Sequence, residues 1–314
     1  MIGRPALTLI RGFCMGAADI VPGVSGGTIA LVFGIYEQLL TNVGLGAKAL
    51  GHLVKGDIGG FRDRLAAIDW LFIVPLGVGI LAAVGLLSSV IEGLLQDRPE
   101  EMAGLFFGLV LGSVVVTWGL LSSRSSTLLA VMLAVGLATF VLLGFQSGPV
   151  SSPPLWAFLG AGAIAICAMI LPGISGSFLL LMMGMYAAVL GAVHDRDIVS
   201  IAVFGFGAII GLALFSTALN WLLEHHHDTL LAALIGLMVG SLRVLWPWPN
   251  GVGIISEEEG ESISGTGLEL PASDQIALPT LLAVAAFAVV IGISRFATSP
   301  SSPESDNATR NFVS

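Results

Sequence analysis

Charged residues are scarce in this chain, and lysine is almost absent. Only 11% of the 314 residues are Asp, Glu, Lys or Arg, and the lysines are Lys48 and Lys55. So few charges cannot cover the surface of a water-soluble domain of this size. Hydrophobic residues make up 55% of the chain, and the mean hydropathy is +0.96. The composition therefore favours an integral membrane protein.

Signals for enzymatic, metal or nucleic-acid chemistry are also missing. No nucleotide-binding loop, catalytic triad or pair of catalytic carboxylates stands out, and the net charge of −9 gives no support for nucleic-acid binding. Cys14 and Cys167 fit no metal or redox spacing. His225–His227 cannot all face one ion from a helix, and we interpret the run as a solvated turn. We expect neither a metal nor another cofactor, and no enzymatic activity.

What the chain has instead is one uncommon motif that occurs twice. Residues 19–28 (DIVPGVSGGT) return as residues 169–178 (MILPGISGSF). In both copies a Pro-Gly-x-Ser-Gly core, which begins at Pro22-Gly23 and at Pro172-Gly173, interrupts a long apolar stretch. Two interrupted hydrophobic segments at corresponding places in two halves indicate the substrate site of a transporter.

Hydropathy divides the chain into eight apolar segments. Two of them, 5–40 and 155–192, contain the interruptions, and at about 36 to 38 residues they are too long for one spanning helix and too short for two. We therefore predict two re-entrant hairpins, each made of two half-helices that meet at the break. The other six segments are predicted single spans, at 70–91, 103–121, 127–146, 199–222, 229–246 and 277–296. The predicted fold is all-α.

Each half of the chain then consists of one hairpin and three spans. The first half covers 1–146, and the second covers 155–314, including an acidic loop at 250–275 and a polar C-terminal tail. Because each half crosses the membrane three times, an odd number, the second half should enter the membrane from the side opposite to the first. Basic residues follow this plan, because more of them fall on the cytoplasmic side when the N-terminus is inside. That side would hold Arg4, Arg11, Lys48, Lys55, Arg62, Arg64, Arg124, Arg295 and Arg310, against Arg98, Arg196 and Arg243 outside. We predict an inverted repeat in the plasma membrane with both termini in the cytoplasm.

A second internal similarity supports the duplication. Residues 106–113 (FFGLVLGS) align with residues 234–241 (LIGLMVGS). Two interpretations of the shared small residues stay open: they allow close helix packing, or they line a pore. The residues concerned are Gly108, Gly112 and Ser113, paired with Gly236, Gly240 and Ser241.

Polar groups beside the two breaks are candidates for anion binding. A helix that restarts after a break points amide N–H groups and a positive dipole end into the adjoining space, and these groups bind phosphate. The alternative is a pair of kinked helices packed around glycine. The candidate phosphate ligands are Ser25, Gly26, Gly27, Thr28, Ser175, Gly176 and Ser177.

Three charged residues add to this hypothesis. Arg11 and Arg243 are candidates to neutralise the phosphate, because a guanidinium group binds phosphate through two parallel hydrogen bonds. Arg11 also fits a positive-inside anchor, and the tryptophans beside Arg243 also fit a membrane interface. Asp19 has no acidic counterpart, since Met169 takes its place. A carboxylate is costly inside the membrane, so a residue that carries one there is a candidate functional residue. Asp19 either couples transport to a proton or sodium ion or caps the amides of its own hairpin.

The motif pair, Asp19 before its first copy, and the run GSLRVLWP at Gly240–Pro247 resemble the domain-of-unknown-function family 368. The resemblance extends from about Arg11 to Arg295. Members of that family are regarded as polyprenyl-phosphate transporters. The resemblance implies that the lipid carrier, undecaprenyl phosphate in bacteria, is returned from the outer to the cytoplasmic leaflet after glycan assembly. The low-lysine, acidic composition would suit an archaeal member from a high-salt habitat, whose carrier would be a dolichyl-type phosphate.

The predicted function is therefore a flippase for polyprenyl phosphate that works by alternating access. Two other functions stay open. A transporter or channel for a small soluble anion would use the same hairpins but needs a continuous polar pore, and the six predicted spans contain few polar residues. A membrane enzyme acting on lipid phosphates needs a cluster of histidine, arginine and acidic groups near the interface.

Overall fold

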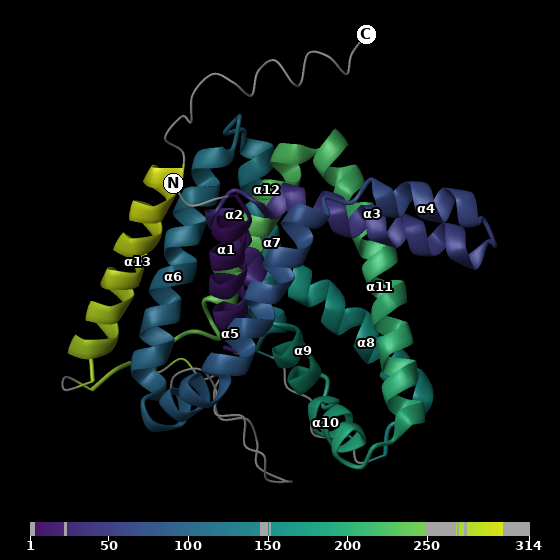
Figure 1. Cartoon of the computed structure of the whole chain (residues 1–314). Helices are drawn as coiled ribbons and strands as arrows, with labels where there is room; N and C mark the ends of the chain where they lie inside the picture. Colours follow the sequence, from purple (N-terminus) through teal and green to yellow (C-terminus); the bar gives the residue numbers. More distant parts are fainter. Residues whose placement is uncertain are drawn as a thin grey trace.

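The computed structural model describes residues 4–21, 24–144, 150, 152–248, 268, 270–272 and 275–297, and the regular structure in those residues is entirely helical (Figure 1). Within the described residues, four helices are long and apolar enough to cross a membrane: α5 (Trp70–Asp97), α6 (Pro99–Leu120), α11 (Ile198–His225) and α13 (Ala277–Ala297). Three shorter apolar helices accompany them, α7 (Ser126–Leu142), α8 (Leu155–Ile170) and α12 (His227–Ser241). The protein is a multi-pass, all-helical membrane protein, as predicted.

Both predicted interruptions are present. The helix α1 (Arg4–Asp19) ends at the first motif, and α2 (Gly26–Val32) restarts after it and packs back against α1. In the second motif α9 (Gly176–Met182) follows α8 and packs back against it in the same way. The next helix, α10 (Tyr186–His194), is bent by 109° from α9. Each motif therefore splits its apolar segment into helices too short to cross a bilayer alone.

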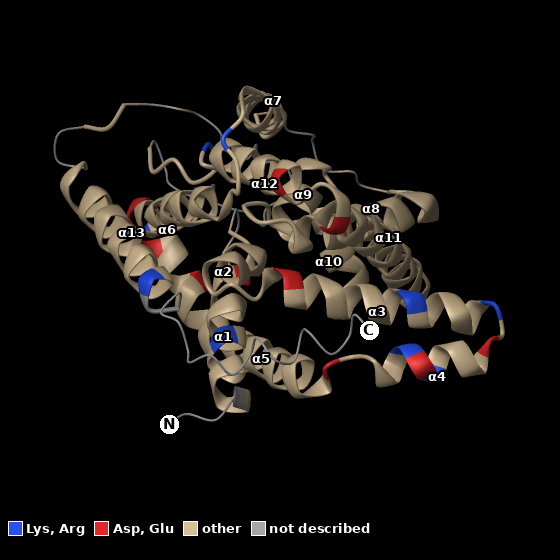
Figure 2. Cartoon of the chain, turned by 90° about the horizontal axis from the view of Figure 1, so that it is seen from above, with Lys and Arg blue, Asp and Glu red and all other residues tan. Residues whose placement is uncertain are grey.

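The stretch after the first hairpin is more helical than the sequence suggested. The apolar segment was predicted to end at residue 40, but α3 (Tyr36–Val54) continues to Val54, and α4 (Ile58–Ala66) follows. Figure 1 shows α3 and α4 at one end of the molecule and α10 at the other. The start of α1 and the end of α13 lie at the end occupied by α3 and α4, and the view from above in Figure 2 shows basic residues on all four of these helices.

Two partly buried asparagine contacts hold α3 in place. The Oδ1 atom of Asn42 accepts a hydrogen bond of 2.7 Å from the backbone amide of Asp69, which caps α5. The Nδ2 atom of Asn220, on α11, donates to the carbonyl of Leu40 at 3.0 Å. The sequence pattern gave no signal for these contacts, and together they fix the exit of the first hairpin against spans from both halves.

The two halves share a helix plan. α5 and α11 both contain 28 residues, and an aspartate caps each of them, Asp69 and Asp197. An Asp side chain at this position satisfies amides that the first turn leaves without an intrahelical partner. Both helices end at a single non-helical residue, Arg98 or His226, with nearly the same backbone angles. These matches support the duplication.

Equivalent helices also pack in equivalent ways, but partly across the halves. α1 lies against α5, and α8 lies against α11, so each hairpin packs on the first span of its own half. The later spans exchange partners: α6 packs on α13 of the second half, and α12 packs on α7 of the first. Neither half is therefore a separate folding unit with its own complete set of helix contacts.

The small residues on α6 and α12 serve this packing. A side chain at Gly108 would collide with the carbonyl of Ala283 on α13, and one at Gly236 would collide with the carbonyl of Met132 on α7. Such contacts let two helix backbones approach closely. The packing interpretation of the repeated glycines is confirmed at these positions, and the pore-lining alternative is wrong for them.

α12 is shorter than its predicted span. The predicted span continues to residue 246, but the helix ends at Ser241, and turns follow at residues 242–245. Fifteen residues extend about 23 Å, less than the ~30 Å of a hydrocarbon core. The hydropathy pattern counted the apolar residues 242–246 as helix, although turn hydrogen bonds such as Val244 N–H to Ser241 O replace the helical ones there.

The histidine run is not merely a solvated turn. His225 ends α11, and His227 begins α12, where its Nε2 atom lies 2.9 Å from a carboxylate oxygen of Glu37 on α3. The next residue, Asp228, accepts hydrogen bonds from the backbone amides of Ser122 and Ser123, at 3.2 and 3.0 Å. This junction thus joins the start of α12 to the first hairpin and to the α6–α7 connection.

Candidate functional site

The two helix breaks touch each other. The hydroxyl of Ser25 donates a hydrogen bond of 3.1 Å to the carbonyl of Met169, at the end of the second hairpin's first helix. The backbone amide of Gly173 donates to the hydroxyl of Thr28 at 2.9 Å. A Cβ atom at Gly27 would lie 2.7 Å from the carbonyl of Ile170, so only glycine allows this approach. The structure thus brings the two copies of the motif together at one place.

Asp19 caps the restarted helix of its own hairpin. Its Oδ1 atom accepts a hydrogen bond of 2.6 Å from the backbone amide of Gly26, the first residue of α2. Its Oδ2 atom would lie 2.6 Å from a Cβ atom at Gly26, which explains the glycine. Ser25 adds a second cap, because its hydroxyl oxygen accepts from the amide of Gly27 at 3.1 Å. Capping, one of the two roles considered for Asp19, is therefore present in the structure.

The second hairpin lacks this cap. Ser175 occupies the position equivalent to Ser25 and has an extended backbone, but its side chain makes no capping hydrogen bond to α9. Its hydroxyl instead lies 2.8 Å from the hydroxyl of Ser177. Met169, which replaces Asp19, has no carboxylate that could accept from the amide of Gly176. The first restarted helix is thus capped by Asp19 and Ser25, whereas the second has no side-chain cap.

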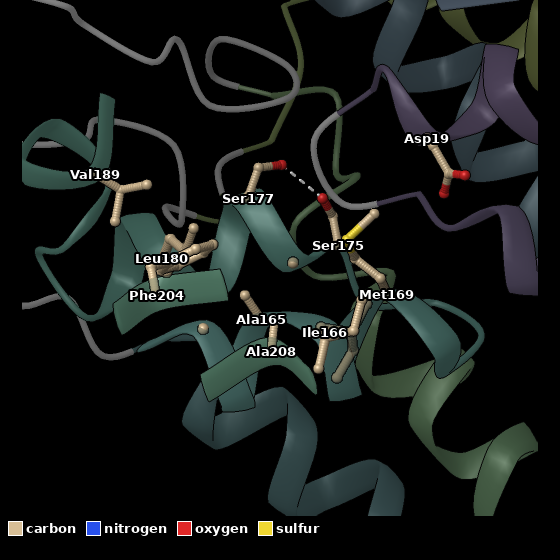
Figure 3. A pocket seen from close by; sticks show the side chains of 13 residues that line it. Asp19, Ala165, Ile166, Met169, Ser175, Ser177, Leu180, Val189, Phe204 and Ala208 are labelled. Carbon is tan, nitrogen blue, oxygen red and sulfur yellow. Dashed lines mark hydrogen bonds between the residues drawn. The ribbon is translucent and has the colours of Figure 1, made fainter. Parts of the chain in front are cut away.

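A cavity of about 360 Å³ opens beside the second break. Ser175 and Ser177 supply hydroxyl groups to its wall, and the carboxylate of Asp19 reaches it from the first hairpin. In the view of Figure 3, Ser175 lies between Ser177 and Asp19. The rest of the lining comes from α8 to α11 and is apolar, for example Ile166 and Phe204. A polar end with apolar walls suits a ligand that has a small polar head and a hydrocarbon chain.

Gly173 shows why the second break has its shape. Its φ angle is +86°, in the left-handed region that residues with side chains rarely adopt. A Cβ atom there would also lie 2.9 Å from the Cα atom of Met238 on α12. The preceding Pro172 has no N–H group to continue a helix. Pro22 and Gly23, the equivalent pair in the first hairpin, lie outside the described residues.

Comparison with known proteins places the chain in a family. The family described as undecaprenyl phosphate translocase-like matches residues 15–263. The chain belongs to this family. The polyprenyl-phosphate transporter of Vibrio cholerae is 39% identical over 301 residues, which cover 92% of this chain and 96% of the relative. The polyprenyl-phosphate transporter of Staphylococcus aureus is 31% identical over 258 residues, which cover 77% of this chain and 86% of the relative. No solved structure matches the chain.

Family membership confirms the resemblance drawn from the motif pair. The matched region includes Asp19, both breaks and the run at Gly240–Pro247. It ends within the acidic loop predicted at 250–275, most of which lies outside the described residues. The site at the two breaks therefore lies within the region that defines the translocase-like family.

The predicted phosphate ligands do not all share the cavity. Ser175, Gly176 and Ser177 line it. Ser25, Gly27 and Thr28 form the contact between the breaks, and Gly26 bonds to Asp19 of its own hairpin. The two candidate arginines lie elsewhere. Arg11 is on α1 but is not among the residues that line this cavity, and Arg243, which follows α12, lines a different one.

Some residues of the site carried no signal in the sequence. The carbonyl groups of Met169 and Ile170 define the contact between the breaks, but backbone acceptors cannot be identified from residue type. Phe204 and Ala208 on α11 face the cavity, whereas other apolar residues of the same helix face outward. Hydropathy alone cannot separate these two faces when lipid and cavity wall are both apolar.

Proposed function

We propose that this protein moves a polyprenyl phosphate between the two leaflets of the membrane in which it resides. The observation that carries the proposal is the amphipathic cavity at the paired helix breaks, found in a member of the translocase-like family. Polyprenyl phosphate has an anionic head and a long apolar tail. Its head is costly to place in hydrocarbon, because a charged group loses its hydration there. A cavity with a polar end lowers that cost while the tail remains in lipid.

In the proposed complex the phosphate binds at Ser175, Gly176 and Ser177. The two hydroxyl groups can turn toward phosphate oxygens, because each is bonded only to the other among the contacts of the described residues. The apolar walls formed by α8 and α11 then receive the first isoprene units. Asp19, whose oxygen caps α2, faces the same cavity.

The difference between the two breaks supports alternating access. In this structure the polar groups of the first break are not available to a ligand, because they all bond within the protein. The residues concerned are Ser25, Gly26, Gly27 and Thr28. The second break faces the cavity. We propose that the roles exchange in the opposite state, in which Ser25 and Thr28 release Met169 and Gly173 and turn to the phosphate. Loss of the Gly26 contact would then free the Asp19 carboxylate to bind a proton or sodium ion, which links the exchange to an ion gradient.

The proposed topology places the protein in the plasma membrane as an inverted repeat with both termini in the cytoplasm. The start of α1 and the end of α13 lie with α3 and α4, on the side rich in basic residues, whereas α10 lies opposite, in keeping with the positive-inside rule. Single cysteines at two exposed positions test this arrangement in a variant that lacks Cys14 and Cys167. A membrane-impermeant maleimide should label Arg196→Cys in intact cells, and Lys55→Cys only after permeabilisation. The reverse pattern would reject the topology.

Reconstitution into liposomes tests the transport function. A fluorescent polyprenyl phosphate should move between leaflets with the intact protein and at least tenfold more slowly with the double variant Ser175→Ala and Ser177→Ala. Ser89→Ala, an exposed serine on α5, is the matched control and should leave transport unchanged. Normal transport by the double variant would reject the proposed phosphate site. Uptake of inorganic phosphate, or release of it from the lipid, would support an anion transporter or an enzyme instead.

A further inference from the structure

Two further cavities in the described part of the chain lie away from the one at the breaks. One, of about 390 Å³, is lined by Trp118 and Arg124 with residues from the start of α7. The other, of about 340 Å³, is lined by Arg243 and Trp246 with Phe140 near the end of α7. Neither shares a lining residue with the cavity at the breaks. Each has one arginine, one tryptophan and mostly apolar walls.

The internal repeat accounts for one shared feature of these two cavities, the tryptophan, whereas their arginines occupy positions that are not equivalent. Extending the alignment of residues 106–113 with 234–241 pairs Trp118 with Trp246. Trp118 lies near the end of α6, and Trp246 directly follows the turns after α12, the equivalent helix. The duplication has thus placed the same aromatic side chain in both cavities. Tryptophan favours the boundary between hydrocarbon and lipid headgroups.

An aromatic ring holds the guanidinium group in each cavity. The Cζ atom of Arg124 lies 5.6 Å from the centre of the Trp118 ring. The Cζ atom of Arg243 lies 4.8 Å from the centre of the Phe140 ring, and its Nη1 atom donates to the carbonyl of Phe140 at 3.1 Å. Gly144 provides the space, because a Cβ atom there would lie 2.6 Å from the guanidinium carbon. Such contacts fix the group and preserve its positive charge.

The chemistry of the walls selects the ligand. Leu128, Leu129 and Met132 line the Arg124 cavity, and Val239 and Leu242 line the Arg243 cavity. A guanidinium group binds a phosphate monoester through paired hydrogen bonds, and the apolar wall suits the chain attached to that phosphate. A soluble anion would gain nothing from the apolar surface, and a neutral lipid would gain nothing from the arginine. A lipid that carries a terminal phosphate matches both parts.

The two cavities lie at opposite ends of the same helices. Ser126, the first residue of α7, lines one, and Phe140, close to its last residue, lines the other. Fourteen residues of α-helix separate positions about 20 Å apart. This distance is most of the ~30 Å thickness of the hydrocarbon core, which is compatible with one cavity in each leaflet.

We propose that the Trp118–Arg124 and Trp246–Arg243 cavities are docking sites for the phosphate head of the carrier lipid, one in each leaflet. The lipid occupies one before it enters the cavity at the breaks and the other after it leaves. This inference rests on the proposed function and deepens it, since it assigns separate loading and release sites. It also gives Arg243 a role away from the breaks.

Photocrosslinking in proteoliposomes tests the inference. The probe is a polyprenyl phosphate with a diazirine on its first isoprene unit, and the matching polyprenol is the control that lacks phosphate. Mass spectrometry should locate adducts at both cavities with the phosphate and at least tenfold fewer with the alcohol. Arg124→Gln should reduce adducts at its own cavity by at least tenfold and leave the other unchanged, and Arg243→Gln should show the converse.

A second set of variants covers the case in which loss of an arginine disturbs folding. Leu129→Trp and Val239→Trp fill the two cavities and keep both arginines; these side chains are 44% and 42% exposed, so a larger residue can be placed there. Each should reduce adducts at its own cavity by at least tenfold. Leu137→Trp, at an exposed position on α7 that lines neither cavity, should change nothing.

The outcomes separate this inference from the proposed function. The double variant Ser175→Ala and Ser177→Ala should lose transport but keep adducts at both cavities. Equal adducts with phosphate and alcohol, or adducts unaffected by the arginine and cavity-filling variants, would overturn the inference even if the intact protein transports lipid. Absence of transport by the intact protein would overturn the proposed function, whatever the pattern of adducts.

Discussion

The hydroxyl of Thr28 accepts a hydrogen bond of 2.9 Å from the backbone amide of Gly173, although 145 positions separate the two residues. Thr28 is completely buried, and Gly173 has a left-handed backbone. The amide of Gly173 thus obtains its partner from the other half of the protein. An unpaired amide at this depth would be costly, so the conformation of one break depends on the position of the other.

Replacement of Thr28 by valine tests this dependence. Thr28→Val keeps the shape of the side chain but leaves the buried amide of Gly173 without its acceptor, which should cost about 1–3 kcal/mol. We expect a lower thermal unfolding temperature in detergent and slower lipid transport. Thr217→Val is the matched control, because Thr217 is exposed on α11 and its hydroxyl bonds only within that helix. Equal unfolding temperatures for the two variants would contradict the proposed contact.

Two substitutions at Asp19 separate capping from ion coupling. Asp19→Asn retains an oxygen that can accept from Gly26 but removes the charge, whereas Asp19→Ala removes both. Loss of the cap should lower stability by about 0.5–2 kcal/mol, so only the alanine variant should unfold earlier. Both variants should lose the response of transport to proton or sodium gradients. A normal gradient response in Asp19→Asn would limit Asp19 to capping.

The close contact between α6 and α13 can be tested with two glycines of one helix. Gly108→Ala should force α6 away from the carbonyl of Ala283 on α13 and cost about 1–3 kcal/mol through overpacking. Gly119→Ala, near the end of α6, meets no atom within 4 Å and should be neutral or slightly stabilising, because alanine favours helix. Unfolding temperatures in detergent compare the two. Similar values would show that the helices do not approach as described.

The junction between α3 and α12 should make stability depend on pH. The hydrogen bond to Glu37 raises the pKa of His227 above its usual 6.5, and the nearby Asp228 adds to this effect against partial desolvation. A group whose pKa is raised in the folded state stabilises it when protonated. The contribution is complete below about pH 6.5 and is lost as the pH rises through the raised pKa of His227. His227→Gln should flatten the unfolding temperature over this range, whereas the neighbouring His226→Gln should keep the wild-type slope. Parallel profiles for all three proteins would exclude this role for His227.

The sequence was sufficient to predict the membrane class, the two breaks and the family. These features depend on local signals: the apolar composition, the helix-breaking Pro-Gly pairs and their repetition. The positions of Asp69 and Asp197 before equivalent helices follow the same local logic, since both are capping residues. The orientation of the second half relative to the first rests on the charge distribution and remains a prediction.

The asymmetry of the site could not be read from the motif. Ser25 and Ser175 occupy equivalent positions, yet one hydroxyl caps a helix and reaches Met169, and the other bonds to Ser177. The choice depends on neighbours that differ between the copies: Ser177, which supplies the second hydroxyl, stands where the first copy has Gly27, and Met169 stands where it has Asp19. The location of Arg243 was likewise beyond the sequence, because the early end of α12 directs this side chain toward Phe140.

The exchange of partners between α6, α13, α12 and α7 has a consequence for the ancestry of this fold. A half-length precursor could have buried these surfaces only by joining with a second copy and swapping spans with it. Gene fusion would then have tethered the two copies, after which each was free to diverge. Two fragments divided between α7 and α8 should accordingly reassemble when synthesised in one cell, whereas either fragment alone would be degraded.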